Sequence, residues 1–257
     1  MKYSFLVNGV SAILSIHLHT LKAVQPAPAR KYPPTFAALG IKIRQHNLPD
    51  LVQRFLFYQL HPDSEIEPDN LLLNQCPVVW DSRVLVFHSA IATFHAPSNS
   101  SGPGGMYREI IHSTPWWTKG DVPAARRDCI FINGGEPDAP GMRGLLIARV
   151  YLFFKFSYAG VEYPCALVHW YTTVGTEPNG STGLWMVTPE STNIRGHSYW
   201  SMGVIHLDSI IRGAHLLPQF PSNTQVHREI NYTQTLDVYR CFYVNKYVDY
   251  HSFEIAF

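Results

Sequence analysis

The stretch that decides the fold is Gly144–Trp170, GLLIARVYLFFKFSYAGVEYPCALVHW. It contains two apolar, aromatic-rich runs, Leu145–Tyr158 and Tyr163–Trp170, on either side of the segment Ala159–Glu162. Runs of this kind, separated by a small residue and glycine, predict two long antiparallel strands joined as a β-hairpin. Both faces of the pair carry apolar residues, so we expect the hairpin inside a sheet or barrel and not at an edge.

The composition describes a chain with a large core and a sparsely charged surface. Of the 257 residues, 46% are hydrophobic and 15% are charged, against about 25% charged residues in an average protein. The length suits one large all-β or mixed domain, or one domain with a smaller appendage. The net charge of +1 gives no global electrostatic case for nucleic-acid binding. A local basic patch around Arg126 and Arg127 stays open.

The four cysteines are widely spaced and form no C-x-x-C pair or zinc-finger spacing. Cys129 and Cys165 lie inside apolar runs, where a small buried thiol is the usual occupant. We therefore expect buried reduced thiols and not a disulfide framework.

The N-terminal stretch has features of a weak secretory signal. Met1 and Lys2 precede an apolar run that is interrupted by Asn8 and Gly9, and Ala-Pro-Ala follows at residues 27–29. The stretch is too short and too polar to span a membrane, and we expect no membrane association. With a cleaved signal, the sequons at Asn99, Asn179 and Asn231 would become glycan sites, which leaves a secreted protein as an alternative.

The chain divides into three predicted parts. Residues 1–34 form a poorly ordered N-terminal segment with a Pro-rich linker, residues 35–75 form a helical segment, and residues 76–257 form a β-rich domain that ends in a helix. In the second part, Pro49 fits the first turn of a second helix. In the third part, apolar residues at helical spacing predict a helix over 235–251.

Short apolar runs between Gly/Pro turns fill the β-rich part. We expect one or two strands over 78–94, a strand or short helix over 106–113, a loop from Pro115 to Arg127, and a strand leading into a helical turn over 203–211. The predicted fold is therefore mixed and mainly β. It is a β-barrel or sandwich flanked by N-terminal helices and a C-terminal helix.

The best candidate metal ligands are His206, Asp208 and His215. On a strand, His206 and Asp208 would face the same side, as chelation requires, and His215 could complete a facial triad. The alternative, which we favour, is that His206 and Asp208 hold a strand end by hydrogen bonds. No residue pattern supports a catalytic constellation or a bound cofactor, so none is predicted.

Aromatic and basic residues supply a candidate binding surface, formed by Trp116, Trp117, Arg126 and Arg127. Exposed tryptophans, including Trp200, could stack on a base or a peptide, although most tryptophans belong to cores. His169 lies among apolar residues and is expected to be a hydrogen-bonded core histidine.

Five phrases along the chain carry a family resemblance. They are RFLFYQLHPDSE (54–65), VFHSAIATFHAPSNSSGPGGMYREIIHSTPWW (86–117), GMRGLLIARVYLFFKFSYAGVEYPCALVHWY (141–171), VIHLDSIIRGAHLLP (204–218) and YVNKYVDYHSFEIAF (243–257). Together, and in this order, they resemble the C-terminal region of Plavaka-type transposases, the proteins of cut-and-paste DNA transposons in mushroom-forming fungi. The resemblance covers about residues 30–257.

The resemblance implies a binding role and not a catalytic one. In the family, strand transfer belongs to an upstream RNase H-like domain with three metal-binding carboxylates, which acts by two-metal phosphoryl transfer. That region is absent from this sequence, so no carboxylate is carried over, and we expect a truncated element or a gene model that starts late. The implied location is nuclear, and the implied partners are chromatin proteins, DNA or the rest of a transposase assembly.

A second similarity rests on strand order. The strands around PCALVHW, LWMVTPE and VIHLDSI are similar in pattern to a bromo-adjacent-homology-like barrel, which is a chromatin-reading module. Two alternatives remain: a secreted β-rich glycoprotein, and a metal-dependent hydrolase that uses His206, Asp208 and His215. Cleavage of residues 1–29 would favour the former, and stoichiometric metal lost on His206→Ala would favour the latter.

Overall fold

The structure of the protein is a computed structural model. It describes residues 20–23, 31–68, 70–79, 82–96, 103–118, 123–134, 139, 141–194, 196–220, 230 and 234–257.

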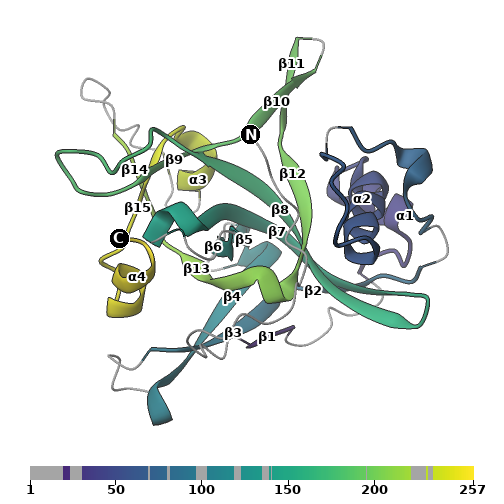
Figure 1. The fold of residues 1–257 in the computed structure, drawn as a ribbon, viewed down its shortest axis with the longest axis horizontal. Helices are drawn as coiled ribbons and strands as arrows, with labels where there is room; N and C mark the ends of the chain where they lie inside the picture. The colour runs from purple at the N-terminus through teal and green to yellow at the C-terminus, as the bar shows by residue number, and fades with distance from the viewer. Residues whose placement is uncertain are drawn as a thin grey trace.

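The predicted hairpin is the centre of the fold, as Figure 1 shows. Strands β7 (Leu145–Tyr158) and β8 (Val161–Thr173) pair from the turn to Ile147 on β7 and Tyr171 on β8. A two-residue turn joins them, and both of its residues have positive φ angles, 48° at Ala159 and 80° at Gly160. Turns of this type match the right-handed twist of the strands that they connect. The prediction of an interior hairpin is confirmed.

Around the hairpin, the chain forms a nearly closed antiparallel barrel. The larger sheet has the order β13-β6-β7-β8-β9-β15-β14, with β12 paired to β8 and β2 paired to β7. Its other strands are β2 (Leu85–Phe87), β6 (Cys129–Asn133), β9 (Met186–Pro189), β12 (Met202–His206), β13 (Ile210–Ala214), β14 (Leu216–Pro218) and β15 (Phe242–Val244). The mainly β fold with flanking helices is therefore confirmed.

A second, four-stranded sheet has the order β1-β3-β4-β5. Its strands are β1 (Thr20–Ala23), β3 (Ser89–His95), β4 (Met106–Thr118) and β5 (Pro123–Arg127). Strand β13 packs beside β3 and β4, which brings the two sheets together. Four short 3₁₀ helices lie in the connections of the described chain: η1 (Leu73–Gln75) between α2 (Leu48–Leu60) and β2, and η2 (Pro103–Gly105), η3 (Gly141–Gly144) and η4 (Leu207–Ser209) between strands.

A β-bulge in β7 distributes the aromatic side chains of this strand between two cores. The pairing shifts between Val150 and Leu152, so Tyr151 has no partner on β8. Beyond the bulge, Phe153 belongs to the core inside the barrel, whereas Phe154 belongs to the core on its outer face. The extra residue therefore changes which face each following side chain takes.

The predicted helix pair covers one end of this outer face. Helices α1 (Phe36–Ile43) and α2 (Leu48–Leu60) are separated by a short break, and Pro49 lies in the first turn of α2 as predicted. The Phe36 ring lies edge-on to Phe154, with 5.8 Å between the ring centroids. Since the helices and the hairpin share this core, residues 35–75 and 76–257 pack as one unit in the described structure.

The C-terminal segment differs from the helix predicted over 235–251. It forms α3 (Thr235–Val238), then β15, then α4 (Tyr250–Ile255). Phe242 and Val244 are buried on one side of β15, which pairs with both β9 and β14. The backbone of this segment gains sheet hydrogen bonds on two sides, and these outweigh the helical spacing of its apolar residues.

Strand pairing extends beyond the predicted strands at two places. Thr20–Ala23, within the predicted N-terminal segment, pairs with β3 as strand β1. The loop predicted from Pro115 to Arg127 is wrong, because residues 115–118 continue β4, and Trp117 and Thr118 pair with Ala124 and Pro123 of β5. In both cases a neighbouring strand supplies hydrogen bonds that the local sequence does not reveal. The expectation of free thiols is confirmed, because all four cysteines are free, with Cys241 partly exposed.

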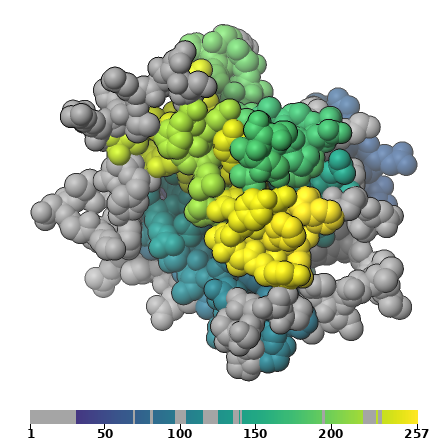
Figure 2. All heavy atoms as spheres, turned by 90° about the vertical axis from the view of Figure 1, so that its left-hand side faces the viewer, coloured from purple at the N-terminus to yellow at the C-terminus, as the bar shows by residue number. Residues whose placement is uncertain are grey.

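The last helix is held to the barrel by a buried charge. The side chain of Arg212 is 5% exposed and donates to both carboxylate oxygens of Asp249, at 2.7 and 2.6 Å. Asp249 is the N-cap residue of α4 and accepts a hydrogen bond from the Ser252 amide. Figure 2 shows these C-terminal residues, in yellow, gathered on one face of the molecule. No helix among the described residues is long and apolar enough to cross a membrane.

Candidate ligand-binding groove

A two-stranded ribbon projects from the barrel between β9 and β12 (Figure 1). Its strands are β10 (Ser191–Ile194) and β11 (His197–Trp200), and the side chains of residues 191–193 and 197–200 are exposed. The base of the ribbon is fixed by backbone hydrogen bonds. Trp170 donates to Ser201 and accepts from Glu190, at 3.0 and 2.9 Å, and Ser201 donates to Glu190 at 3.0 Å.

The register of the ribbon decides which side chains share a face. Ser191 lies opposite Trp200, and Asn193 lies opposite Ser198. Directly opposite residues of an antiparallel pair point to the same side, so Trp200 shares a face with these polar side chains. Its neighbour Tyr199 points to the other side of the ribbon.

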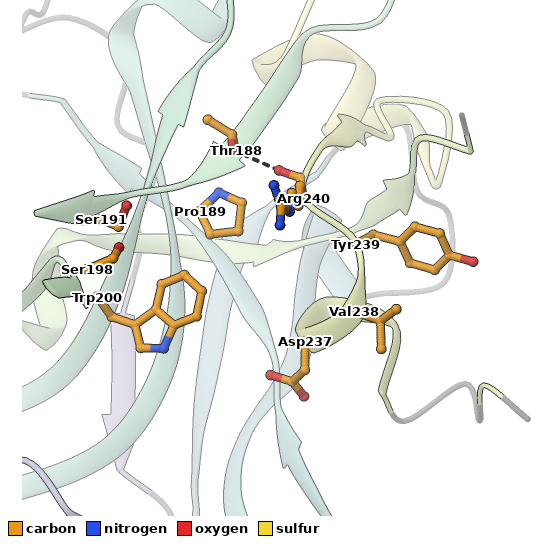
Figure 3. A pocket seen from close by; sticks show the side chains of 9 residues that line it. All are labelled: Thr188, Pro189, Ser191, Ser198, Trp200, Asp237, Val238, Tyr239 and Arg240. Atoms are coloured by element: carbon orange, nitrogen blue, oxygen red, sulfur yellow. Dashed lines mark hydrogen bonds between the residues drawn. The ribbon is translucent and has the colours of Figure 1, made fainter. Parts of the chain in front are cut away.

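The Trp200 face of the ribbon forms one wall of a hollow of about 560 Å³. Figure 3 shows Trp200 and Asp237 pointing into this space from opposite walls. The lining residues are Thr188, Pro189, Ser191, Ser198, Trp200, Asp237, Val238, Tyr239 and Arg240. We call this hollow the Trp200 groove. Its volume lies within the range of about 300–1,000 Å³ found for ligand pockets.

The second wall of the groove, residues 237–240, is tied to the barrel at two points. Thr188 Oγ1 donates to the Arg240 carbonyl oxygen at 2.8 Å. Arg149 donates to both carboxylate oxygens of Asp237, at 2.5 and 3.3 Å. The Arg149 side chain is 5% exposed, whereas Asp237 is 58% exposed. Asp237 therefore neutralises a buried guanidinium and still faces the groove.

Beneath Trp200 lies the buried His169, with 4.6 Å between the two ring centroids. His169 Nε2 lies 2.8 Å from the carbonyl oxygen of Glu190. A carbonyl only accepts hydrogen bonds, so Nε2 carries the proton. Burial lowers the pKa of His169, and this effect exceeds the opposing contribution of the Glu190 hydrogen bond. His169 is therefore a neutral support for Trp200, and the prediction of a hydrogen-bonded core histidine is confirmed.

Behind His169, further side chains pack in a row away from the groove. Tyr151, the bulge residue, lies edge-on to His169 at 6.2 Å between ring centroids. The guanidinium of Arg127 lies 4.0 Å from the centre of the Tyr151 ring. Arg127 and Arg149 therefore place two basic groups behind the groove, with the Asp237 carboxylate between Arg149 and the ligand space.

Two residues of the predicted binding surface, Arg126 and Arg127, have described side chains. Arg127 packs on Tyr151, and Arg126 pairs with Asp128, at 3.2 Å between Nε and Oδ1. Trp116 and Trp117 belong to β4, and their side chains are outside the part of the chain that the structure describes. The sequence indicates Trp200 as a stacking residue but not its position, and no sequence pattern marks Arg149, Asp237 or Arg240 as residues of a site.

The candidate metal ligands lie at the end of β12 and beyond it. His206 Nδ1 accepts a hydrogen bond from the Asp208 amide at 3.2 Å and lies 3.4 Å from Asp208 Oδ2. His215 Nδ1 lies 3.1 Å from the side-chain nitrogen of Asn245. Across the part of the chain that the structure describes, no three His, Cys, Asp or Glu side chains form a group that could hold a metal ion.

One sequon can be placed in the structure. The side-chain oxygen of Asn179 accepts hydrogen bonds from the amides of Ser181 and Thr182, both at 3.1 Å. Asn99 and Asn231 lie outside the described residues.

The chain was compared with models of protein families, with curated proteins and with solved structures. None of these comparisons finds a match.

Proposed function

We propose that the chain is a non-catalytic C-terminal binding module of a Plavaka-like cut-and-paste transposase, and that it binds its partner through the Trp200 groove. The transposase setting rests on the five sequence phrases, and the observation that carries the binding role is an exposed indole held on a fixed base beside a hollow of ligand size. Trp200 is 54% exposed, although its ribbon is tied to the barrel on both sides. Exposed aromatic residues in a preformed hollow are typical of recognition sites.

The chemistry of the lining supports binding in preference to catalysis. The nearest imidazole, His169, is buried, and its protonated nitrogen is already committed to the Glu190 carbonyl. The carboxylate of Asp237 is committed to Arg149. Among the described residues, neither group forms a hydrogen bond with a serine or cysteine side chain, the pairing that activates such a nucleophile. The same groups are well suited to hold a ligand in one orientation.

The proposed setting is nuclear. Within a transposase, the module would contact DNA, a chromatin protein or the rest of the assembly, while an upstream nuclease domain supplies the metal-binding carboxylates. The mainly β barrel is compatible with the bromo-adjacent-homology-like pattern proposed from strand order, and a binding module of this kind would select a target site or assist assembly.

The genomic DNA upstream of Met1 provides the test. An intact or decayed reading frame that encodes an RNase H-like core with three carboxylates is the expected result. A promoter that directly precedes an expressed, signal-bearing transcript would overturn the proposal. In that case, glycosylation of the secreted product would be measured by mass spectrometry.

A further inference from the structure

Trp200 is a preformed stacking platform. Its ribbon is tied to the barrel at Glu190 and Ser201, and His169 supports one side of the indole. Over half of the side chain remains exposed towards the groove. A flat ring that stacks on this indole would gain contact area without the entropic cost of ordering a flexible side chain.

The charges of the groove favour an anionic ligand over a cationic one. Asp237 is the acidic residue of the lining, and its charge is balanced by Arg149. Arg240 also lines the groove, and among the residues that the structure describes it forms no ion pair. A lysine or arginine side chain of a ligand would therefore meet excess positive charge. A phosphate would be attracted to Arg240.

A planar ring and a phosphate occur together in a nucleotide. We infer that the Trp200 groove holds an unpaired nucleotide of a single-stranded nucleic acid, with its base on the Trp200 indole and its phosphate against Arg240. The hydroxyls of Ser191 and Ser198 line the same space and provide hydrogen bonds to the sugar or the base edge.

The nucleic-acid strand must be unpaired at the nucleotide that the Trp200 groove holds. In a duplex the ring faces of each base are covered by its neighbours, and only an unstacked base presents a face to an aromatic side chain. Since every base has such a face, this contact selects single strands without selecting a sequence. The inference rests on the proposed binding function and names its ligand class.

The test uses the full chain and fluorescein-labelled 12-nucleotide oligothymidylate, with fluorescence anisotropy measured over a range of KCl concentrations. Trp200→Ala is expected to weaken binding about 5- to 150-fold, the range for loss of one stacked base. Trp200→Phe keeps a ring and should restore most of the affinity. Tyr199→Ala is the matched control, because Tyr199 is also 54% exposed but lies on the opposite face of the ribbon.

Arg240→Ala separates the phosphate contact from the stacking contact. It should reduce the slope of log affinity against log salt by about 0.7, the value for one phosphate of a single strand. Trp200→Ala should leave the slope unchanged, because stacking releases no counterions. An oligouridylate of equal length shows whether the groove prefers single-stranded RNA or single-stranded DNA. Tighter binding of RNA or of DNA would support the inference and identify which one is held.

Three results would overturn the inference. They are tighter binding of the matching duplex, equal losses for Trp200→Ala and Tyr199→Ala, and no binding of either oligonucleotide. Each leaves the proposed function standing if the upstream frame encodes a nuclease core, because a duplex or a chromatin protein could still be the partner. Loss of the upstream frame, by contrast, would refute the proposed function irrespective of the anisotropy.

Discussion

Replacement of Arg212 by alanine should detach the C-terminal helix from the barrel. Arg212 donates to both oxygens of Asp249 and, at 3.0 Å, to Glu109 Oε2. Its guanidinium also lies 4.7 Å from the centre of the Phe94 ring. The variant would leave the carboxylates of Glu109 and Asp249 without the guanidinium that binds both.

The magnitude follows from the burial of the three groups. Removal of one partner from a buried ion pair typically costs about 3–5 kcal/mol. Glu109 and Asp249 keep 24% and 29% of their side chains exposed, so water partly solvates them after the change. We therefore expect the lower end, about 3 kcal/mol of unfolding free energy, or a fall in Tm of about 6–12 °C.

Urea and thermal unfolding, followed by circular dichroism, measure this loss. Lys155→Ala is the matched control, because it removes a 2.7 Å ion pair with Glu162 whose side chains are 31% and 61% exposed. Such an exposed pair contributes within about 1 kcal/mol. Arg212→Lys keeps the charge but not the planar fork and should give an intermediate loss. If Arg212→Ala were no more destabilising than Lys155→Ala, the reasoning would be refuted.

Three further predictions concern pH, packing and the central turn. Burial alone would raise the pKa of Asp249, but the hydrogen bonds from Arg212 and Ser252 outweigh it and hold this pKa below its ordinary value. Because the folded-state pKa is the lower one, this stabilisation is complete above the unfolded pKa of about 3.9 and is lost as the pH falls further. Urea titrations from pH 6 to pH 2 should show that loss, and a smaller one in Arg212→Ala. Gly203→Ala would bring its new methyl group into the Trp170 ring, at an overpacking cost of about 1–3 kcal/mol. Gly180→Ala, with open space around it, should be close to neutral in the same assay, and equal effects would contradict the packing argument. Ala159→Asn should raise the unfolding free energy by up to about 1 kcal/mol, because asparagine tolerates the positive φ of this position better than alanine. A loss of stability would count against this account of the turn.

The sequence was sufficient where a structural signal is local. The hairpin of β7 and β8 could be predicted because two long apolar runs flank a small residue and Gly160. The helix pair could be predicted because Pro49 marks the first turn of α2. His169 could be placed in the core because its neighbours along the chain are apolar. In each case, neighbouring residues in the chain carry the information.

The C-terminal segment and the groove depended on contacts between distant parts of the chain. Phe242 fits a helical pattern equally well, and only the partner strands on both sides make its segment a strand. Arg149 and Asp237 lie 88 residues apart and meet only in the folded barrel. Likewise, Trp200 and Tyr199 are adjacent and equally exposed, and only the register of the ribbon decides which one faces the groove.

The sequence by itself therefore determined the central hairpin, the helix pair and the mainly β character of the chain. The tertiary structure alone decided which face of a strand each side chain takes, the strand in the C-terminal segment and the residues of the Trp200 groove. The physical reason is that side chains alternate between faces with a period of two, so one extra residue such as Tyr151 reverses the face of each side chain that follows.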